Sequence, residues 1–576
     1  MTYPPYALTE RLEAALGDPN DDAQEFSLAR CLDLDAREAF PTRICAELDR
    51  LSIPAYYVPA RHGGAVHTFE DTLQVVRLMA RRDLTVAIAH GKTFLGGISA
   101  WVAADPEQAK QLAAEIMSGR VVSWGLTERE HGGDLLAGQV SAIETPDGYR
   151  IDGEKWLVNN ATRAHLICVL ARTDPAGGAR GFSLVLVDKQ RLAPESYQHR
   201  PRVRLHGIRG ADISGIEFDG AQVGADALVG ARGAGLEITL KGFQLTRTLC
   251  AGLSLGAADR ALRLAVGFAR EHRMYNRTLI ELPHAARTLV EAYTDLLIAE
   301  VTSTVATRSI HALPGELSVA SAVVKYLVPT GTDRSIAALG QVLGARAFLA
   351  GTYQHGAFQK VERDHRIVGI FDGSTLVNLN SVINQFPFLA RGFRRGQVDE
   401  AGLAASADLE HPPPEFDPAR LDLVARAGSS LVAALPAAVA EVRRLATAGS
   451  VASGLAVRAG ELEVIAADLH EQMSRHRPVA REVAVESFTL AEQYSRVFAA
   501  AACLQFWLHN RSRPGLDQML WDDGRWVEAC LARLLQQLRP GPDDDLLDRL
   551  LPALVAQHEG GRLFSPLPGR LAEEPR

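Results

Sequence analysis

Several features that assign proteins to familiar classes are absent from this sequence. Its six cysteines include no CxxC pair and its 17 histidines include no HExxH motif, so we expect reduced thiols, no disulfide framework and no metal site. No apolar run approaches the roughly 18–20 residues that a membrane span needs, and the first residues form no secretory signal. The net charge of −8 excludes a generally basic surface for nucleic acid. We therefore expect a soluble, cytoplasmic protein.

What is present is an ordinary globular composition in a long chain. Hydrophobic residues make up 47% of the 576 residues and charged residues 23%, which excludes wholesale disorder. Because a domain usually holds roughly 100–200 residues, a chain of this length should contain three or four domains.

Hydrophobic periodicity divides the chain into four predicted domains. Residues 1–118 have mostly helical spacing, and residues 119–232 consist of short β-rich runs separated by turn signals, as in a small sandwich or barrel. Residues 233–400 return to long helical patterns, and residues 401–576 comprise a proline-rich linker followed by more helices. The prediction is a mainly α fold with a central β domain and an extra C-terminal helical domain. The clearest segments are the predicted helices 69–80, 106–117, 253–269 and 289–310, and the predicted strands 149–151, 166–169 and 182–187.

One motif in the third domain matches a known catalytic pattern. Residues 252–256 have the Gly-x-Ser-x-Gly pattern of a serine hydrolase, with Ser254 as the candidate nucleophile. That chemistry needs a strained turn between a strand and a helix, whereas Ser254 lies inside a helical pattern, where small residues usually mark close packing. Gly91-Lys92-Thr93 lacks the upstream glycine of a phosphate loop.

An ordered series of short motifs resembles the acyl-CoA dehydrogenase family of flavoproteins. The resemblance covers roughly residues 40–395, and its specificity comes from the order and spacing of the motifs. They are WGLTEREHGGD at 124–134, DGY at 147–149, GEKWLVNNA at 153–161, HGIRGAD at 206–212 with FD at 218–219, QVLG at 341–344, RD at 363–364 and FDGST at 371–375. The family fold, a helical domain followed by a β domain and a four-helix domain, agrees with the predicted α–β–α order.

The resemblance implies that Asp372 is the catalytic base. The family usually has glutamate immediately before the Gly-Thr of this motif, so Asp372 keeps the carboxylate on a shorter stem. The alternative interpretation is an Asp-Gly turn between helices. The spacing from Arg363 (372 − 363 = 9) matches the family and favours the base. An aspartate base also occurs in the nitroalkane oxidase branch of the family, so the substitution leaves the substrate open.

The resemblance also implies residues that bind FAD and the thioester. In the β segment the FAD positions are Trp124, Leu126, Thr127, Gly132, Gly133, Leu157, Val158 and Asn159. In the helical half they are His272 or the neighbouring Arg273, Gln341, Gly344, Ala345 and Ser374, with Ala345 replacing a family glycine. The substrate positions are Gly133, Phe243, Gln244, Arg247 and Gly373. Because Gly133 and Gln244 both depart from the family's pantetheine contacts, the thioester carrier could be coenzyme A or an acyl-carrier protein.

Together these residues predict an FAD-dependent acyl-thioester dehydrogenase of fatty acid metabolism. In that reaction a base removes the α proton while a hydride leaves the β carbon. The implied partners are an electron acceptor, either a flavoprotein or oxygen, and a second copy of the chain in a homodimer or higher oligomer. The alternatives are an oxidase of the same superfamily (acyl-CoA oxidase or nitroalkane oxidase-like), a serine hydrolase acting through Ser254, and a flavin-free scaffold.

Overall fold

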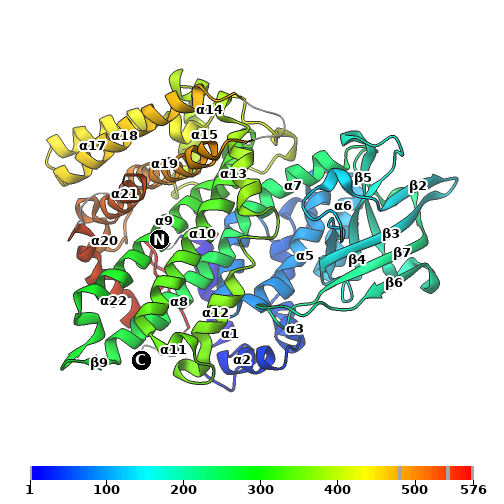
Figure 1. Cartoon of the computed structure of the whole chain (residues 1–576), viewed down its shortest axis with the longest axis horizontal. Coiled ribbons are helices and arrows are strands. Elements are labelled where there is room, and N and C mark those ends of the chain that lie inside the picture. Colours follow the sequence, from blue (N-terminus) through cyan, green and yellow to red (C-terminus); the bar gives the residue numbers. More distant parts are fainter. Residues whose placement is uncertain (1–2, 478–482, 540–544, 573–576) are drawn as a thin grey trace. The chain divides into compact units, whose positions relative to one another are not determined.

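The computed structural model describes residues 3–477, 483–539 and 545–572. The chain forms two compact units. Unit 1 consists of Met1–Leu32, Thr68–Arg82 and Arg247–Arg576, and unit 2 of Asp33–His67 and Asp83–Thr246. Unit 1 is built from helices, and unit 2 contains the large sheet (Figure 1). A mainly helical fold with a central β region and extra C-terminal helices is therefore confirmed.

The sheet of unit 2 has eight strands in the order β6-β7-β3-β2-β4-β5-β8, with β1 added in parallel to β4. A single residue pair, Ser141 with Arg172, joins its two halves. The described strands thus form one connected sheet with two ends, and side chains of its two halves share one buried core, as in the expected sandwich. The strands are β1 Val122–Gly125, β2 Ser141–Thr145, β3 Gly148–Asn159, β4 Leu166–Arg172, β5 Phe182–Asp188, β6 Tyr197–Arg200, β7 Ile213–Gly224 and β8 Leu228–Val229. They include all three predicted strand segments.

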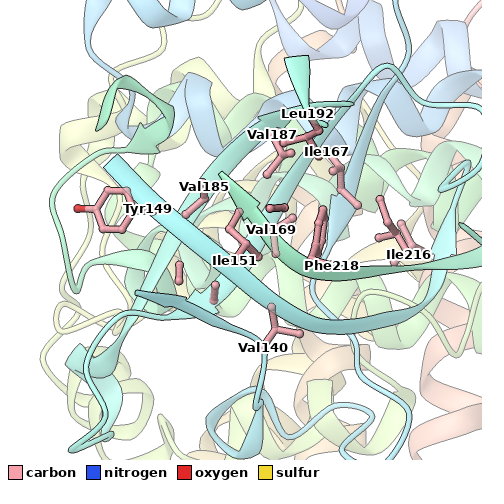
Figure 2. Close-up of a cluster of buried hydrophobic side chains, with 14 of the residues drawn as sticks. Val140, Tyr149, Ile151, Ile167, Val169, Val185, Val187, Leu192, Ile216 and Phe218 are labelled. Atoms are coloured by element: carbon pink, nitrogen blue, oxygen red, sulfur yellow. The ribbon is translucent and has the colours of Figure 1, made fainter. Parts of the chain in front are cut away.

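Strand β4 is buried on both faces, because its alternate side chains enter two different clusters. Ile167, Val169 and Ala171 pack with side chains of β3, β5 and β7 (Figure 2). Cys168 and Leu170 point the other way, into a cluster that includes residues of α5 and α7. The sheet is therefore fixed to its helices through the same strand that pairs with β1.

Four helices accompany the sheet in unit 2: α3 Thr42–Arg50, α5 Leu84–Ala103, α6 Pro106–Met117 and most of α7 Gly235–Leu249. Asp83 and Asp105 cap α5 and α6 by accepting main-chain N–H bonds in the first turn. Between α3 and α5, unit 2 also contains the short 3-10 helices η1 Ile53–Tyr57 and η2 Ala60–His62.

The long helices of unit 1 pack around one another, with α8 against α4, α9, α10 and α12. All four predicted helices are confirmed, those of unit 1 as α4, α8 and α9. The early and central helices are α1 Pro4–Leu16, α4 Phe69–Arg82, α8 Ala251–Glu271, α9 Pro283–Ala312, α10 Leu317–Leu343, α11 Ala345–Phe348, α12 Ala357–His365, α13 Thr375–Ile383, α14 Phe386–Arg394 and α15 Glu400–Ala407. Helix α2 Leu28–Ala36 crosses the border between the units, and a short ribbon pairs β9 Arg273–Met274 with β10 Arg277–Thr278.

The C-terminal extension packs on the central helices of unit 1 (Figure 1). Helix α19 contacts α9, α10 and α13, and α22 contacts α8 and α9. The extension comprises α16 Ser430–Ala433, α17 Leu435–Thr447, α18 Ser453–Ser474, α19 Val485–Asn510, α20 Gln518–Trp521, α21 Arg525–Leu538 and α22 Leu551–Glu559. None of the described helices is long and apolar enough to cross a membrane.

A buried polar network joins the two ends of unit 1. Arg77 on α4 pairs with Glu300 on α9 at 3.1 Å, and the Ser565 hydroxyl donates to the same carboxylate at 2.7 Å. The Tyr6 hydroxyl of α1 also donates to Glu300 and lies 3.0 Å from Arg77 Nη1. Since each ionised group has a partner, the desolvation cost of burying the pair is offset by several hydrogen bonds.

Candidate functional site

In unit 2, Trp124 at the end of β1 lies beside Phe243 of α7. The ring centroids are 5.2 Å apart with an interplanar angle of 59°. Gly242 permits this approach, because a Cβ there would lie 3.2 Å from Ile98 Cγ2 and 3.4 Å from Trp124. The indole Nε1 of Trp124 is buried and has no partner among the described residues. Trp124, expected to bind FAD, and Phe243, expected to bind substrate, are thus neighbours, and the indole N–H of Trp124 remains available to a ligand.

A buried ion pair holds the main chain that follows β1. Lys155 Nζ on β3 lies 2.7 Å from Glu128 Oε1 and donates to the carbonyl of Leu126 at 3.0 Å. Burial lowers the pKa of Lys155, although the Glu128 carboxylate opposes that shift. Glu128 also accepts the main-chain N–H groups of Gln139 and Val140, at 2.7 and 3.1 Å. One carboxylate therefore ties down both ends of the segment 128–140.

The loop held in this way exposes its backbone at two glycines. Gly132 has a φ of +45°, which favours glycine. A Cβ added to Gly132 or to Gly133 would meet nothing within 4 Å, and both residues are exposed. Thr127, just before the loop, uses its carbonyl to accept the Trp156 N–H at 3.0 Å. The backbone of the loop is thus open to an anionic ligand such as a pyrophosphate.

A β-bulge in β3 projects Leu157 away from the sheet. The register against β7 shifts between Trp156 and Val158, and Leu157 has a φ of +55° and remains 42% exposed. A β-strand leucine with positive φ has a strained backbone. Val158 is buried in the sheet core, so only its main chain is available to a ligand. Asn159 donates from Nδ2 to the Ile88 carbonyl at 3.1 Å, while its buried Oδ1 lacks a partner among the described residues.

In unit 1, Asp372 and Gly373 form a tight turn in the left-handed region. Their φ angles are +55° and +95°. Arg247 Nε donates to the Asp372 carbonyl at 2.8 Å, and a Cβ on Gly373 would lie 2.7 Å from Arg247 Nη2. Burial lowers the pKa of Arg247, although the Asp372 carboxylate opposes that shift. Asp372 and Gly373 thus form an Asp-Gly turn, and the close approach of Arg247 leaves no room for a side chain at position 373.

Sequence reasoning missed Cys250 in this part of unit 1. Its thiol donates to Asp372 Oδ2, with an Sγ–O distance of 3.5 Å. The available signal was its spacing: Cys250 follows Arg247 by three residues in a helical pattern, so both side chains lie on one face. Asp372 is therefore held at its main chain by a guanidinium and at its carboxylate by a thiol.

The other helical positions cluster around Phe268 of α8. The His272 ring stacks on Phe268 at 4.7 Å, and the Arg346 guanidinium lies 5.1 Å from the centroid of the same ring. Arg346 directly follows Ala345, the first residue of α11, and Gly344 before it has a φ of +59°. His272 and the residue that follows the 341–345 segment, Arg346, thus contact the same ring, Phe268, which sequence reasoning did not single out.

Arg273 and Gln341 are exposed, and Ser374 is half-buried. Arg273 begins the β9–β10 ribbon, whose two-residue turn, Tyr275-Asn276, has φ angles of +53° and +65°, as in a type I′ hairpin. Ser374 caps α13 with its main chain, and Asn378 Nδ2 donates to the Ser374 carbonyl at 2.9 Å. These side chains are accessible to a ligand or a partner.

Ser254 makes the hydrogen bonds of a Ser-His-Asp arrangement. Its hydroxyl lies 2.8 Å from His365 Nε2, and His365 Nδ1 lies 2.6 Å from Asp333 Oδ1. However, Ser254 is inside α8 without a strained turn, and both Ser254 and His365 are completely buried. A buried helical serine cannot meet a substrate carbonyl, so we interpret the three residues as a link between α8, α10 and α12.

Comparison with known proteins finds two matching family descriptions. "Acyl-CoA dehydrogenase, middle domain" matches residues 123–221, and "Acyl-CoA dehydrogenase, C-terminal domain" matches residues 233–386. A similar curated protein is the probable acyl-CoA dehydrogenase fadE25 of Mycobacterium leprae, 26% identical over 248 residues, which cover 43% of this chain. The match spans 63% of the length of that relative.

Solved structures share the fold at low sequence identity. Butyryl-CoA dehydrogenase from Megasphaera elsdenii has a TM-score of 0.59 at 20% identity, covering 66% of this chain and 96% of that one. The prolyl acyl carrier protein oxidase AnaB has a TM-score of 0.57 at 18% identity, covering 62% and 97%. At these identities the likeness shows the fold alone.

Proposed function

Because this chain belongs to the acyl-CoA dehydrogenase family, we propose that it is an FAD-dependent enzyme that introduces a double bond between the α and β carbons of an acyl thioester. The observation that carries the proposal is the arrangement around Asp372. An acidic side chain stands at the family's base position, in a turn fixed by Arg247 and with Cys250 donating to its carboxylate.

The residues of unit 2 fit the flavin. The buried Trp124 Nε1 and Asn159 Oδ1 lack partners among the described residues, and Gly132 and Gly133 leave open space where side chains would stand. We assign the ring to the stretch around Trp124, Leu126, Thr127 and Leu157, and the pyrophosphate to the two glycines. The positions His272, Arg273, Gln341, Gly344, Ala345 and Ser374 would bind the adenosine side. FAD, when bound, supplies the acceptor for the hydride that leaves the β carbon.

Asp372 would act as the base that takes the α proton. Its φ of +55° is a costly conformation for aspartate, and such strain is retained where the surrounding structure enforces it for function. Arg247 holds the main chain of this turn, and Cys250 orients one carboxylate oxygen. The main-chain N–H groups of the turn, with Gly373, are candidates to stabilise the charge that develops on the thioester carbonyl.

We assign the carrier arm of the thioester to Gly133, Phe243, Gln244 and Arg247. Gln244 is 4% exposed, so its side chain is buried rather than at an open surface. Both coenzyme A and an acyl-carrier protein fit this proposal, the second because the oxidase AnaB, whose title names a prolyl acyl carrier protein, shares the fold. The second candidate function is therefore an oxidase that uses oxygen as its electron acceptor.

We further propose a cytoplasmic homodimer that acts in fatty acid metabolism and delivers its electrons to a flavoprotein. None of the six cysteines, all of which are described, forms a disulfide, which suits a reducing compartment. Tyr275 and Phe348, 85% and 88% exposed, flank the helical FAD positions and suit an apolar contact with a second copy. Light scattering of the purified protein should give twice the chain mass of 62.2 kDa.

The decisive experiment is anaerobic bleaching of the flavin. The purified protein should be yellow and should release FAD identified by mass spectrometry. A screen of acyl-CoA and acyl-carrier thioesters should find a substrate that bleaches it. Asp372→Asn should lower the bleaching rate at least about a hundredfold, since general-base catalysis contributes roughly 10²–10⁴-fold, whereas Asp372→Glu should retain activity.

Each component of the proposal can fail separately. A colourless protein that refuses added FAD would exclude both the dehydrogenase and the oxidase. Bleaching at the parent rate by Asp372→Asn would leave the flavoenzyme intact but remove Asp372 as its base. Peroxide formed in stoichiometric amount when the reduced protein meets air would identify the oxidase.

A further inference from the structure

Unit 2 contains a cavity of about 520 Å³. Its walls come from α3, η1, α5 and the turn between β3 and β4. The residues that line it include none of those assigned above to FAD or to the thioester. Its volume lies within the roughly 300–1,000 Å³ typical of small-molecule pockets. The cavity therefore has room for a ligand of its own.

A chain of three polar side chains forms one wall of the cavity. His90 Nε2 on α5 lies 3.0 Å from Asp49 Oδ1, and His90 Nδ1 lies 2.7 Å from the Tyr57 hydroxyl. Tyr57 and His90 are buried, whereas Asp49 is exposed. Burial raises the pKa of Tyr57, so the phenol keeps its proton. In the tautomer whose Nε2–H donates to Asp49, Tyr57 donates to Nδ1, which leaves the phenol oxygen as an acceptor.

The lining of the cavity includes a second acceptor, the side chain of Asn160. Asn160 is 1% exposed, its Nδ2 donates to the Ala89 carbonyl at 2.8 Å, and its main-chain N–H donates to the Asp212 carbonyl at 2.6 Å. Its Oδ1 has no partner among the described residues. A buried amide oxygen without a donor is costly. This wall therefore calls for a neutral group that donates one hydrogen bond, since burying a charged ammonium here would be more expensive.

The mouth of the cavity carries a guanidinium that makes no ion pair with a described carboxylate. Arg163 is exposed and lies 3.8 Å above the Phe40 ring, in a stacked position. Arg120, which also lines the cavity, is neutralised by Glu115 at 2.7 Å and Asp188 at 2.9 Å. A planar guanidinium fixed in this way matches a carboxylate.

We propose that this cavity is a binding site for a small hydroxy acid, whose carboxylate pairs with Arg163 and whose hydroxyl donates to Asn160 Oδ1. The two polar groups of the ligand match two groups of the lining, the Arg163 guanidinium and the Asn160 amide oxygen. A plain fatty acid would leave the amide oxygen without a donor and would press hydrocarbon against the Tyr57 and His90 polar groups.

The test is calorimetric titration of the purified full-length protein with 6-hydroxyhexanoate. We expect one molecule bound per chain, with hexanoate and 6-aminohexanoate binding at least tenfold more weakly. Two variants should each weaken binding at least tenfold: Arg163→Gln, which removes the cation, and Ala46→Trp, which fills the mouth from the exposed face of α3. Arg204→Gln, an exposed arginine of unit 2 outside the lining, should bind within twofold of the parent.

The variants also separate this cavity from any thioester site. Absence of saturation up to about 10 mM 6-hydroxyhexanoate, or equal affinity for hexanoate, would overturn the proposal. Binding that survives Arg163→Gln would place the ligand elsewhere and would overturn it as well. Because Arg163 lies at the surface, its variant should fold, and a thermal melt within 2 °C of the parent checks this.

Discussion

The side chain of Arg247 and the main chain of Asp372 are joined by a hydrogen bond from Nε to the carbonyl oxygen, 2.8 Å long, across 125 residues of sequence. The guanidinium therefore restrains the turn that carries the carboxylate. Gly373 makes this possible, because no side chain fits between its Cα and Arg247 Nη2.

Gly373→Ala should reduce turnover far more than flavin binding. The new Cβ would lie 2.7 Å from Arg247 Nη2, and the alanine would have to adopt a φ of +95°. Arg247 must therefore move, and the turn loses the hydrogen bond that restrains it. We expect the bleaching rate to fall at least about tenfold, equivalent to about 1.4 kcal/mol in the barrier, with FAD content unchanged. Stopped-flow absorbance measures the rate.

The matched control is Gly396→Ala, also in unit 1. Gly396 has a φ of +56° and open space around its added Cβ, so this variant has backbone strain without a collision. It should lose stability but keep the parent bleaching rate. Equal rates for Gly373→Ala and Gly396→Ala would show that the approach of Arg247 is irrelevant.

Cys250→Ala should slow proton abstraction about threefold to tenfold, the effect of losing one hydrogen bond of roughly 1 kcal/mol. The thiol donates to Asp372 Oδ2, and without it the carboxylate is less well oriented. Cys250→Ser, which keeps a donor, should restore most of the rate. The measurement is the single-turnover bleaching rate at saturating thioester.

Cys530→Ala serves as the control for the loss of a buried sulfur. Cys530 is also completely buried in unit 1 but lies on α21. This variant should lower the melting temperature and leave the bleaching rate unchanged. A Cys250→Ser variant as slow as Cys250→Ala would argue against the hydrogen bond.

Lys155→Met should destabilise unit 2 and weaken FAD binding. It leaves the Glu128 carboxylate buried without its cation, which typically costs about 3–5 kcal/mol, and it releases the Leu126 carbonyl and the loop with Gly132. Urea unfolding and the ratio of flavin to protein absorbance measure the two effects. The double variant Lys155→Met with Glu128→Gln should recover part of the stability, since no unpaired charge remains.

His311 predicts a pH dependence of unfolding. Burial lowers its pKa from 6.5 to about 4, although the hydrogen bond that Nδ1 donates to the Pro414 carbonyl opposes that shift. Nε2 accepts the Phe69 N–H at 3.1 Å. Below pH 6.5 His311 binds a proton in the unfolded chain but stays unprotonated in the folded chain. The free energy of unfolding therefore decreases as the pH falls from 6.5 towards 4. The shift corresponds to at most about 3 kcal/mol.

His311→Asn should flatten the free energy of unfolding between pH 4 and 6.5, as measured by urea titrations at several pH values. His411→Asn provides a control of opposite sign, since the hydrogen bond to Asp408 raises the pKa of His411. An unchanged slope in His311→Asn would mean that this histidine does not report on folding.

Much of the fold follows from the sequence because its signals are local. Pro106 after a capping Asp105 begins α6 where expected, and the strands at 166–169 and 182–187 extend only slightly in β4 and β5. The three predicted domain boundaries and the assigned site residues stay predictions. The bulge at Leu157 was not foreseen, since it depends on pairing with β7.

The features that sequence reasoning missed join distant residues. Cys250 and Asp372 are 122 residues apart, and no pattern along the chain relates them. The Ser254–His365 contact spans 111 residues and turns a catalytic motif into a packing link. Likewise, Asn160 is one residue from a predicted FAD position, yet its amide faces a separate cavity.

The network of Tyr6, Arg77, Glu300 and Ser565 has a consequence for biosynthesis. Tyr6 and Ser565 are 559 residues apart and 2.9 Å from each other. At about 5–20 residues per second, a ribosome needs roughly half a minute to two minutes to make the second after the first. Until Ser565 leaves the exit tunnel, unit 1 lacks one hydrogen-bond partner of the buried pair between Arg77 and Glu300. Nascent chains halted before residue 565 should therefore depend on chaperones.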